Sequence, residues 1–178
     1  MAEKGEVGMV KMKKLVAIAL VVLCLCGCTG GNLGGDDSPE EVVSNVLDAY
    51  MDADIEEIVE MLPRAIAEPY LKINQEKIDG MNESIEKELE GLETDYEIGK
   101  KTKMSEGEIV RYESRLTSAA QRYVKEAGLG NPAMIKIDIT EAYTVEAILE
   151  NGRNKSKAEF PVGKIGEKWY LLYDSPNM

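Results

Sequence analysis

Residues 135–149 read IKIDITEAYTVEAIL, and the pair Asn151-Gly152 follows closely. The apolar residues of this stretch share one parity: Ile135, Ile137, Ile139, Tyr143, Val145, Ala147 and Leu149. Side chains of a strand alternate between its two faces, so this spacing predicts one long strand with a buried face. Asn-Gly is a strong signal for a two-residue hairpin turn. We therefore expect the strand to lead directly into an antiparallel partner.

The segments after this turn predict two further strands. Alternating apolar residues from Ala158 to Val162 predict the first, and Pro161 within it favours an edge position or a β-bulge. Gly166-Glu167 predicts a second turn, which leads into the apolar and aromatic run from Trp169 to Tyr173. Another strand is expected over 94–104, where Tyr96 and Ile98 alternate with polar residues. Together these segments predict a curved antiparallel meander.

Two capped helices are predicted well before these strands. Ser38-Pro39-Glu40-Glu41 opens the first, with serine as N-cap, proline at the first helical position and glutamate placed to close a capping box. Asp54, with Glu57 three residues later, opens the second, which Pro63 ends. An EF-hand is excluded here, because Glu57 and Pro63 occupy the positions that need glycine and glutamate. Capping explains these acidic residues, and we expect no metal site.

Longer helices are predicted in the middle of the chain. Apolar residues recur every three or four positions over 65–92, which predicts one long amphipathic helix that Pro69 and Gly80 start or bend. Ser105-Glu106-Gly107-Glu108 is another capping box, and the helix that it opens is expected to end at Gly128. The predicted fold class is α+β. We expect a single domain over 38–178, with N-terminal helices packed on one face of the sheet.

The N-terminal segment predicts an export signal. A lysine cluster over 11–14 precedes an apolar run over 15–25, which is shorter than the roughly 20 residues that a membrane-spanning helix needs. Leu25-Cys26-Gly27-Cys28 resembles the lipobox of prokaryotic lipoproteins. By that resemblance residues 1–28 are a lipoprotein signal peptide, and Cys28 carries the lipid and becomes the mature N-terminus. An uncleaved signal anchor is the alternative.

The residues before the lipobox indicate where translation starts, and those after it indicate how far the exported domain lies from the membrane. Two glutamates near the beginning are unusual in a basic signal, which favours translation from Met9 or Met12 over Met1. Residues 29–37, TGGNLGGDD, are glycine-rich and polar and predict a flexible tether. Its mean reach is roughly 15–18 Å. The domain is thus expected at the cell membrane, on its extracytoplasmic face.

The charge of the chain is strongly acidic. The sequence contains 21 Lys and Arg against 33 Asp and Glu, a net charge of −12. The first 28 residues hold more lysines than glutamates, so the exported part is more acidic than the whole. This balance argues against a nucleic-acid partner, whose phosphates need a basic surface. It also argues against docking on anionic lipid headgroups by net charge.

Histidine and cysteine usage excludes several kinds of chemistry. The chain has no histidine, and its three cysteines are Cys24, Cys26 and Cys28, all within the signal. Triads that use histidine, cysteine nucleophiles, thiolate metal sites and disulfides are therefore not expected in the exported domain. We expect no cofactor. Any catalysis would depend on carboxylates, tyrosines, lysines or serines.

Two motifs together resemble a known superfamily. Ser38-Pro39-Glu40-Glu41 begins a helix pair just after a lipobox tether, and Gly166-Glu167-Lys168-Trp169-Tyr170-Leu171 ends a set of antiparallel strands. This combination resembles the nuclear transport factor 2-like superfamily, and more narrowly the small exported prokaryotic lipoproteins built on that cone-shaped (cystatin-like) α+β fold. The resemblance covers roughly half of the exported chain, over 38–63 and 135–174. The long helices over 65–92 and 105–128 depart from it.

Within such a fold, a polar residue in the inward-facing row of a strand marks a candidate site. Glu141 is such a residue, because it shares the parity of the apolar row, and Tyr143 follows two positions later. If Glu141 is buried, its carboxylate would have a raised pKa and act as a base or bind a cationic ligand. If the chain bends near Thr140, the carboxylate would instead face water.

Two functions from different classes follow from these observations. The first is a non-enzymatic, lipid-anchored module that binds a small ligand or an envelope protein. The second is an enzyme of carboxylate and tyrosine chemistry, similar to the isomerases of the resembled superfamily, with Glu141 in a pocket. The absence of histidine and of exported cysteine favours the first. Asn82-Glu83-Ser84 and Asn154-Lys155-Ser156 also fit the N-glycosylation pattern, in segments expected to be exposed.

Overall fold

The computed structural model describes residues 35–91, 94–151 and 154–174. Residues Leu33–Met178 form one compact unit by themselves. Its elements, in chain order, are α2 (Pro39–Met51), α3 (Ile55–Glu60), α4 (Arg64–Ile73), α5 (Gln75–Leu89), β1 (Thr94–Lys103), α6 (Glu106–Glu126), the 3-10 helix η1 (Pro132–Met134), β2 (Glu141–Asn151), β3 (Asn154–Ile165) and β4 (Lys168–Leu171).

The four strands form one antiparallel sheet in the order β1-β2-β3-β4. The register of β2 and β3 is continuous from the pair Glu141 and Lys164 to the pair Asn151 and Asn154. Only residues 152 and 153 connect these strands, so the predicted hairpin is present, but Asn151 of the predicted Asn151-Gly152 turn belongs to β2 and pairs with Asn154. The predicted α+β class and the antiparallel meander are therefore confirmed.

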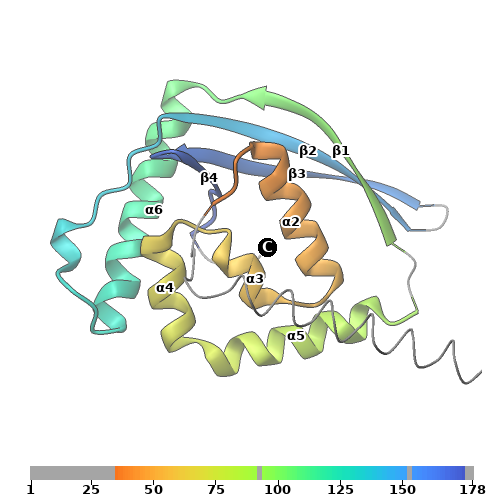
Figure 1. Ribbon diagram of the computed structural model, residues 1–178, viewed down its shortest axis with the longest axis horizontal. Coiled ribbons are helices and arrows are strands. Elements are labelled where there is room, and N and C mark those ends of the chain that lie inside the picture. The colour runs from red at the N-terminus through yellow and green to blue at the C-terminus, as the bar shows by residue number, and fades with distance from the viewer. Residues whose placement is uncertain (1–34, 92–93, 152–153, 175–178) are drawn as a thin grey trace, which may run out of the picture. The chain divides into compact units, whose positions relative to one another are not determined.

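Helices cover one face of this sheet. Helix α2 contacts all four strands, and Figure 1 shows it lying against the sheet, with α3, α4 and α5 on its far side and α6 crossing one end of the strands. The core between these layers is apolar. It includes Val42 and Val46 of α2, Leu116 of α6, Val145 of β2 and Val162 of β3, all fully buried.

The predicted caps of α2, α3 and α6 are present. Ser38 Oγ accepts from the Glu41 amide at 3.2 Å, and Asp54 Oδ1 accepts from the Glu57 amide at 3.0 Å. The Glu41 carboxylate accepts from the Asp37 amide rather than from that of Ser38, one residue outside the expected capping box. Ser105 and Glu108 close a complete capping box at the start of α6. Of the acidic residues near α3, Asp54 acts as the cap of that helix.

The prediction of one long helix over 65–92 is wrong. The chain breaks at Asn74, whose φ of −124° and ψ of 20° lie outside the helical region, into α4 and α5. The Asn74 side chain donates to the Tyr70 carbonyl at 3.0 Å, so it takes over an acceptor that an uninterrupted helix would give to the backbone. Pro69 lies inside α4 without ending it.

The strand predicted from residue 135 begins only at Glu141. Residues 135–139 run along α6 instead, and their amides donate to side chains of that helix. Ile137 N donates to Thr117 Oγ1 at 3.1 Å, and Ile139 N donates to Glu113 Oε1 at 2.8 Å. Ile137 and Ile139 remain buried. The alternation of apolar residues therefore predicted their burial correctly, but it did not predict that they would pack along α6 instead of in the sheet.

Pro161 does not mark an edge strand, because β3 lies between β2 and β4. The pairing of β3 with β4 extends only from Val162 to Ile165. Beyond it the Leu172 amide donates to the Pro161 carbonyl at 2.8 Å. Pro161 lacks an N–H, but it lies opposite a residue beyond the end of the short strand β4. The pairing of β3 with β4 therefore loses no hydrogen bond at Pro161.

The last residues of the predicted tether belong to the fold. Asp36 forms an antiparallel bridge with Trp169, in which each amide donates to the other carbonyl at 2.9 Å. Asp37 pairs with Lys168 at 2.7 Å. Gly35 has a φ of +73°, and a Cβ at this position would lie 2.7 Å from the Trp169 carbonyl oxygen. The prediction of a free tether through residue 37 is thus wrong for residues 35–37.

Candidate functional site

Glu141 and Tyr143 lie at the start of β2 and contact each other. The Tyr143 hydroxyl donates to Glu141 Oε1 over 2.6 Å. Lys103 of β1 is paired with Tyr143 in the sheet register, and its Nζ lies 3.9 Å from the same glutamate oxygen. The structure thus brings together the two candidate residues that the sequence indicated, with a lysine beside them.

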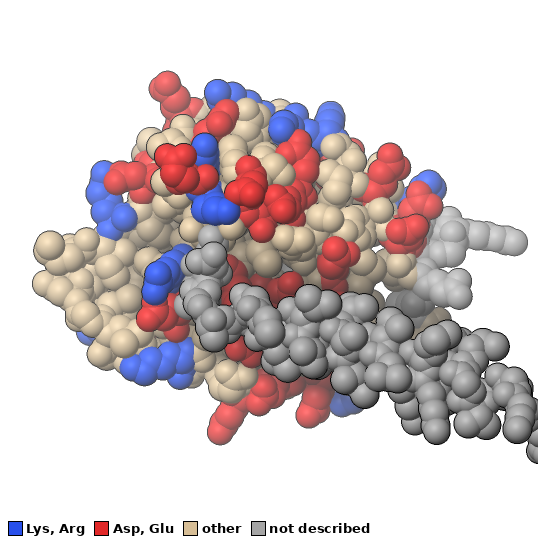
Figure 2. Space-filling view, viewed as in Figure 1, with Lys and Arg blue, Asp and Glu red and all other residues tan. Residues whose placement is uncertain are grey.

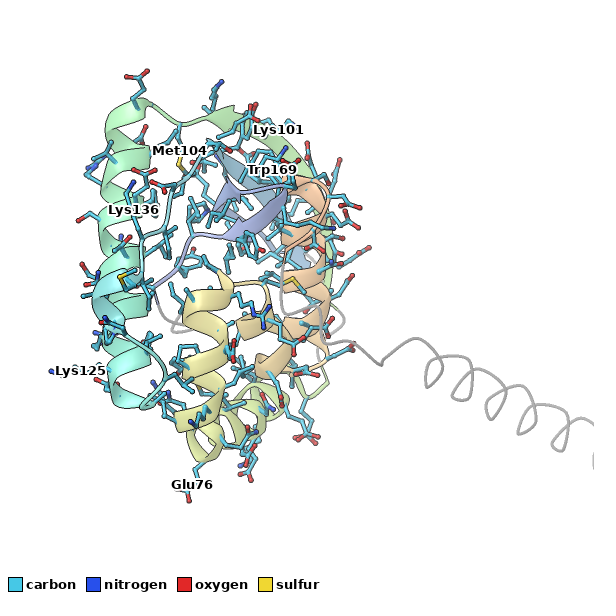
Figure 3. The ribbon with its side chains drawn as sticks, turned by 60° about the vertical axis from the view of Figure 1, so that its left-hand side comes forward. Glu76, Lys101, Met104, Lys125, Lys136 and Trp169 are labelled. Carbon is cyan, nitrogen blue, oxygen red and sulfur yellow. The ribbon has the colours of Figure 1, made fainter. Side chains whose placement is uncertain are left out.

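A second ion pair flanks this contact. Lys101 Nζ lies 2.7 Å from Glu40 Oε1 of α2 and 5.4 Å from the centroid of the Tyr143 ring. The hydrogen bond between them lowers the pKa of Glu40 and raises that of Lys101, so both remain charged at neutral pH. Tyr143 also lies 5.7 Å from the ring of Trp169. Figure 3 shows Lys101 and Trp169 at the same end of the sheet.

The protonation of Tyr143 limits what this cluster can do. The hydrogen bond to Glu141 raises the pKa of the Tyr143 hydroxyl above its ordinary value of 10.0, so the phenol keeps its proton at neutral pH. The Glu141 side chain is 37% exposed, and a bend at Thr140 precedes it. The hypothesis of a buried carboxylate is therefore wrong. The bend turns Glu141 toward water, as the alternative predicted.

An apolar hollow lies elsewhere, between α4 and the segment that follows α6. It has a volume of about 510 Å³. Its apolar walls are formed by Ala65 and Pro69 of α4, Val124 of α6, and Leu129 and Ile135 of the following segment. We call it the α4 hollow. Its volume falls in the range of roughly 300–1,000 Å³ that small-molecule sites occupy.

The walls of the α4 hollow depend on how α6 ends. Gly128, with a φ of +66°, stops the helix, and the Leu129 amide donates back to the Val124 carbonyl at 2.9 Å. Asn131 Oδ1 then accepts from the Ala133 amide at 3.1 Å and starts η1. This turn brings Leu129 against α4.

Polar groups lie at the rim of the α4 hollow. Arg64 and Glu68, one helical turn apart on α4, form an ion pair of 3.4 Å. Both side chains are at least half exposed, so the pair is weak and its arginine is accessible to a ligand. An apolar wall with a guanidinium at its edge suits a molecule that has an apolar body and an anionic group.

Two other hollows among the described residues are lined by charged side chains. The larger one, about 580 Å³, lies between α5 and the turn after α2, with Asp52, Glu86 and Glu90 among its walls. Another, about 360 Å³, lies on α6 beside Arg111 and Arg115. Within 35–91, 94–151 and 154–174, no group of three or more acidic side chains is arranged to hold a metal ion. Glu141 lines none of the three hollows.

Several predicted sites lie outside the described residues. These are the signal peptide with its lipobox, the lipidated Cys28, and the alternative starts at Met1, Met9 and Met12. The Asn154 side chain lies outside them as well. Asn82 is described, and it is partly buried rather than exposed, because its Oδ1 accepts from the Ile55 amide at 2.9 Å. Its side chain therefore serves the start of α3.

The sequence pattern did not indicate the residues of the α4 hollow. Ala65, Val124 and Ile135 come from three separate segments, and of these only Ile135 had been assigned to the buried face of a predicted element. One signal was present: residues 127–135, AGLGNPAMI, contain no charged residue although the chain is highly charged. An uncharged loop with exposed apolar side chains favours an interaction surface.

In the part of the chain that the structure describes, no helix combines the length and the apolar character needed to cross a membrane. Comparisons of the chain with protein-family models, with curated proteins and with solved structures gave no match.

Proposed function

We propose that this protein is a lipid-anchored extracytoplasmic binding module. In this proposal Cys28 carries the lipid, and the domain over 38–178 binds a small amphipathic ligand in the α4 hollow. The lipobox sequence supports the anchor. The apolar walls and the volume of about 510 Å³ support the ligand site, and they are the observation that carries the proposal.

The finer fold assignment is part of the same proposal. We infer a nuclear transport factor 2-like domain from the resemblance of Ser38-Pro39-Glu40-Glu41 and of the β4 segment. An antiparallel meander with a capped helix α2 against it supports this assignment. Such folds host many unrelated functions, so the proposed function depends on the site and not on the fold.

The alternative is an enzyme that uses Glu141 and Tyr143. One observation favours it, the 2.6 Å hydrogen bond between the two side chains. Against it stand the exposure of Glu141 and its position outside the hollows described above. A proton acceptor in an open, hydrated position gains little from its surroundings, so the binding module is the better-supported function.

The experiment uses 1-anilinonaphthalene-8-sulfonate, a probe with an apolar body and an anionic group. It is titrated into the soluble fragment 33–178, which forms a compact unit by itself, and fluorescence reports binding. We expect saturable binding that Ala65→Phe abolishes by filling the α4 hollow. Arg64→Gln should weaken it about tenfold, as the loss of one charged hydrogen bond implies.

Two controls make this test specific. Ala133→Phe adds the same ring to the exposed helix η1, outside the hollow, and should leave the affinity unchanged. Glu141→Gln should also leave it unchanged. Equal losses in Ala65→Phe and Ala133→Phe would contradict the α4 hollow as the site. A loss confined to Glu141→Gln would favour the enzyme alternative.

A further inference from the structure

Helix α6 has a basic stripe on its solvent-facing side. Arg111, Arg115, Ser118, Arg122 and Lys125 are all exposed and follow one another at intervals of four and three residues. This spacing places them on one helix face, over a length of about 21 Å at 1.5 Å per residue. Three of the five arginines in the sequence lie in this stripe.

The acidic residues of α6 are arranged differently from its basic ones and do not form a stripe of their own. Glu113 is turned toward the segment after the helix, where it accepts from Ile139 N. Glu108 is held at the N-terminus by the capping box. Three acidic residues border the stripe: Asp174, whose Oδ2 lies 3.3 Å from Arg115, Glu108, which lines a hollow with Arg111 and Arg115, and the exposed Glu126, one helical turn after Arg122. Arg122 lies over the ring of Tyr123 at 4.6 Å, and its guanidinium remains exposed.

Exposed apolar side chains gather at the C-terminal end of the same helix. Met134 of η1 is 81% exposed and Ile73, the last residue of α4, is 38% exposed. Lys72 joins this end, because its Nζ donates to the Ala127 carbonyl at 3.1 Å. Figure 2 shows an uncharged projection on the side where Figure 1 places η1, with basic side chains next to it. In Figure 3, Lys125 points outward from α6.

We propose that the α6 basic stripe and the uncharged loop 127–135 dock on an anionic phospholipid surface. In this arrangement the Met134 side chain enters the boundary between headgroups and acyl chains, while Arg122 and Lys125 contact lipid phosphates. Apolar groups beside basic ones are what such a surface binds. The apolar residues here lie on a projecting loop rather than in a groove, and a bilayer accommodates a projection without a matching cavity. This favours lipid over a folded acidic protein.

The net acidity of the domain does not prevent this docking. Interactions between exposed charges are largely screened beyond a Debye length of about 8 Å at physiological salt. Helix α5, where Glu76, Asp79 and Glu83 are exposed, is a separate helix from the stripe. When the stripe touches lipid, acidic groups on other faces are largely screened from it by salt. Any repulsion that remains turns those faces away from the lipid and so favours the docked orientation. The net charge of the chain argues against docking on anionic lipid only if all faces of the domain act together, whereas a docked domain presents one face to the lipid.

The docking rests on one part of the proposed function, the lipid on Cys28, and not on a ligand in the α4 hollow. The chain from Cys28 to Asp36 spans at most about 29 Å. An anchored domain is therefore always close to the bilayer, and even a weak contact is populated because the local concentration of lipid is high.

The experiment places the full chain in lipid nanodiscs and measures tryptophan quenching by brominated phosphatidylcholine. Met134→Trp puts a reporter on η1, Glu83→Trp puts one on α5, and the unsubstituted chain gives the background of the buried Trp169. Each chain is studied in discs of brominated phosphatidylcholine alone and in discs with an equal amount of phosphatidylglycerol.

We expect strong quenching of Met134→Trp in the discs with phosphatidylglycerol, weak quenching in neutral discs, and none beyond background for Glu83→Trp. Adding Arg122→Gln and Lys125→Gln should lower the ratio of docked to free domain roughly 25-fold, at about fivefold per basic residue. Lys77→Gln with Lys87→Gln removes the same charge from α5 and is the matched control, which should have little effect.

Three results would overturn the proposal. The first is equal quenching in neutral and anionic discs, which would mean that the stripe does not recognise charge. The second is an equal loss in the Arg122/Lys125 and Lys77/Lys87 pairs, which would mean that only net charge matters. The third is a shifted emission of Met134→Trp without bromine quenching, which would indicate contact with protein instead of lipid. Binding of the sulfonate probe to fragment 33–178 is unaffected by any of these results, so the two proposals fail separately.

Discussion

Helices α5 and α6 are both amphipathic and highly charged, yet they are built into the domain to different degrees. Helix α5 buries a single residue, Ile78, and no side chain caps its N-terminus. Helix α6 buries five residues, begins with a complete capping box and supplies side-chain acceptors to the segment after it. Helical spacing predicts that a helix forms, but the packing partners determine how much of the fold depends on it.

The two helices also differ in the charge that they expose. Glu76, Asp79, Glu83, Glu86 and Glu88 dominate α5, whereas arginines and a lysine line the exposed face of α6. Helix α5 is thus acidic overall, whereas α6 has four acidic and four basic residues and gathers the basic ones on one exposed face. A function that depends on charge is therefore determined by the charges on one face of the molecule and not by the net charge of the chain.

The largest expected effect is on α6. Leu116→Ala removes a fully buried side chain from the core, and we expect the free energy of unfolding to fall by about 2–5 kcal/mol. Chemical denaturation of fragment 33–178 measures it. Val110→Ala is the control, because Val110 lies on the same helix and is 60% exposed. Similar losses in both variants would contradict the packing of α6 described above.

Ile78→Ala tests whether α5 is attached mainly through one residue. Ile78 is fully buried, so the substitution should lower the free energy of packing α5 on the domain by about 2–4 kcal/mol. We expect α5 to detach while the rest of the domain stays folded. Hydrogen exchange should then become fast in the amides of α5 and remain slow in those of α6. If protection fell equally in both helices, α5 would be as central to the fold as α6.

The capping box gives a smaller difference between the helices. Ser105→Ala should lower the free energy of unfolding by about 1 kcal/mol, because the Glu108 amide loses its acceptor. Asn74→Ala at the start of α5 loses no N-cap bond and should cost less. Denaturation curves of the two variants measured side by side test this order. The reverse order would mean that the Asn74 contact with the Tyr70 carbonyl matters more.

Tyr70→Phe is expected to stabilise the packing of α4 on α6. Tyr70 lies 5.2 Å from Tyr123 of α6, and its hydroxyl is buried without a hydrogen-bond partner among the described residues. Removing that hydroxyl relieves the cost of an unpaired polar group, with a gain of up to about 1 kcal/mol. A raised melting temperature of fragment 33–178 would show the gain. A lowered one would reveal a partner for the hydroxyl.

The smallest expected effect concerns the acidic residues of α3, which packs against α5. Burial, and then the nearby Asp54 carboxylate, raise the pKa of Glu57 above its ordinary 4.5. A raised pKa means that the folded state holds the proton more tightly, so the contribution of Glu57 to stability should rise as pH falls from 7 toward 4.5 and gain nothing further below. Glu57→Gln should add a few tenths of a kcal/mol at pH 7 and reduce this rise.

The local parts of the fold were predictable from sequence and the distant ones were not. Serine and aspartate caps act within three residues, so Ser38, Asp54 and Ser105 marked the helix starts correctly. The bridge of Asp36 with Trp169 depends on residues more than a hundred positions apart, and nothing near Asp36 indicates it. The break at Asn74 was missed because the apolar spacing continues across it, although the backbone does not.

The candidate site shows the same limit. The sequence indicated Glu141 and Tyr143 together, and the two side chains are in contact, but parity was wrong in predicting an inward-facing Glu141. Its exposure depends on the bend at Thr140, where residues 135–139 leave the sheet to run along α6. The α4 hollow and the basic stripe arise from the arrangement of several segments. The net charge of the chain did not indicate that basic residues would gather on one face of α6.

The bridge between Asp36 and Trp169 determines where a pulling force would enter the domain. If the chain is held by a lipid on Cys28, tension along residues 29–34 first reaches the two backbone hydrogen bonds at the edge of β4, with the Asp37 and Lys168 pair just behind them. The Asp36 side chain also accepts from Asn45 Nδ2 of α2 at 3.1 Å. The sheet edge and α2 therefore share the load at Asp36, ahead of the rest of the helical layer.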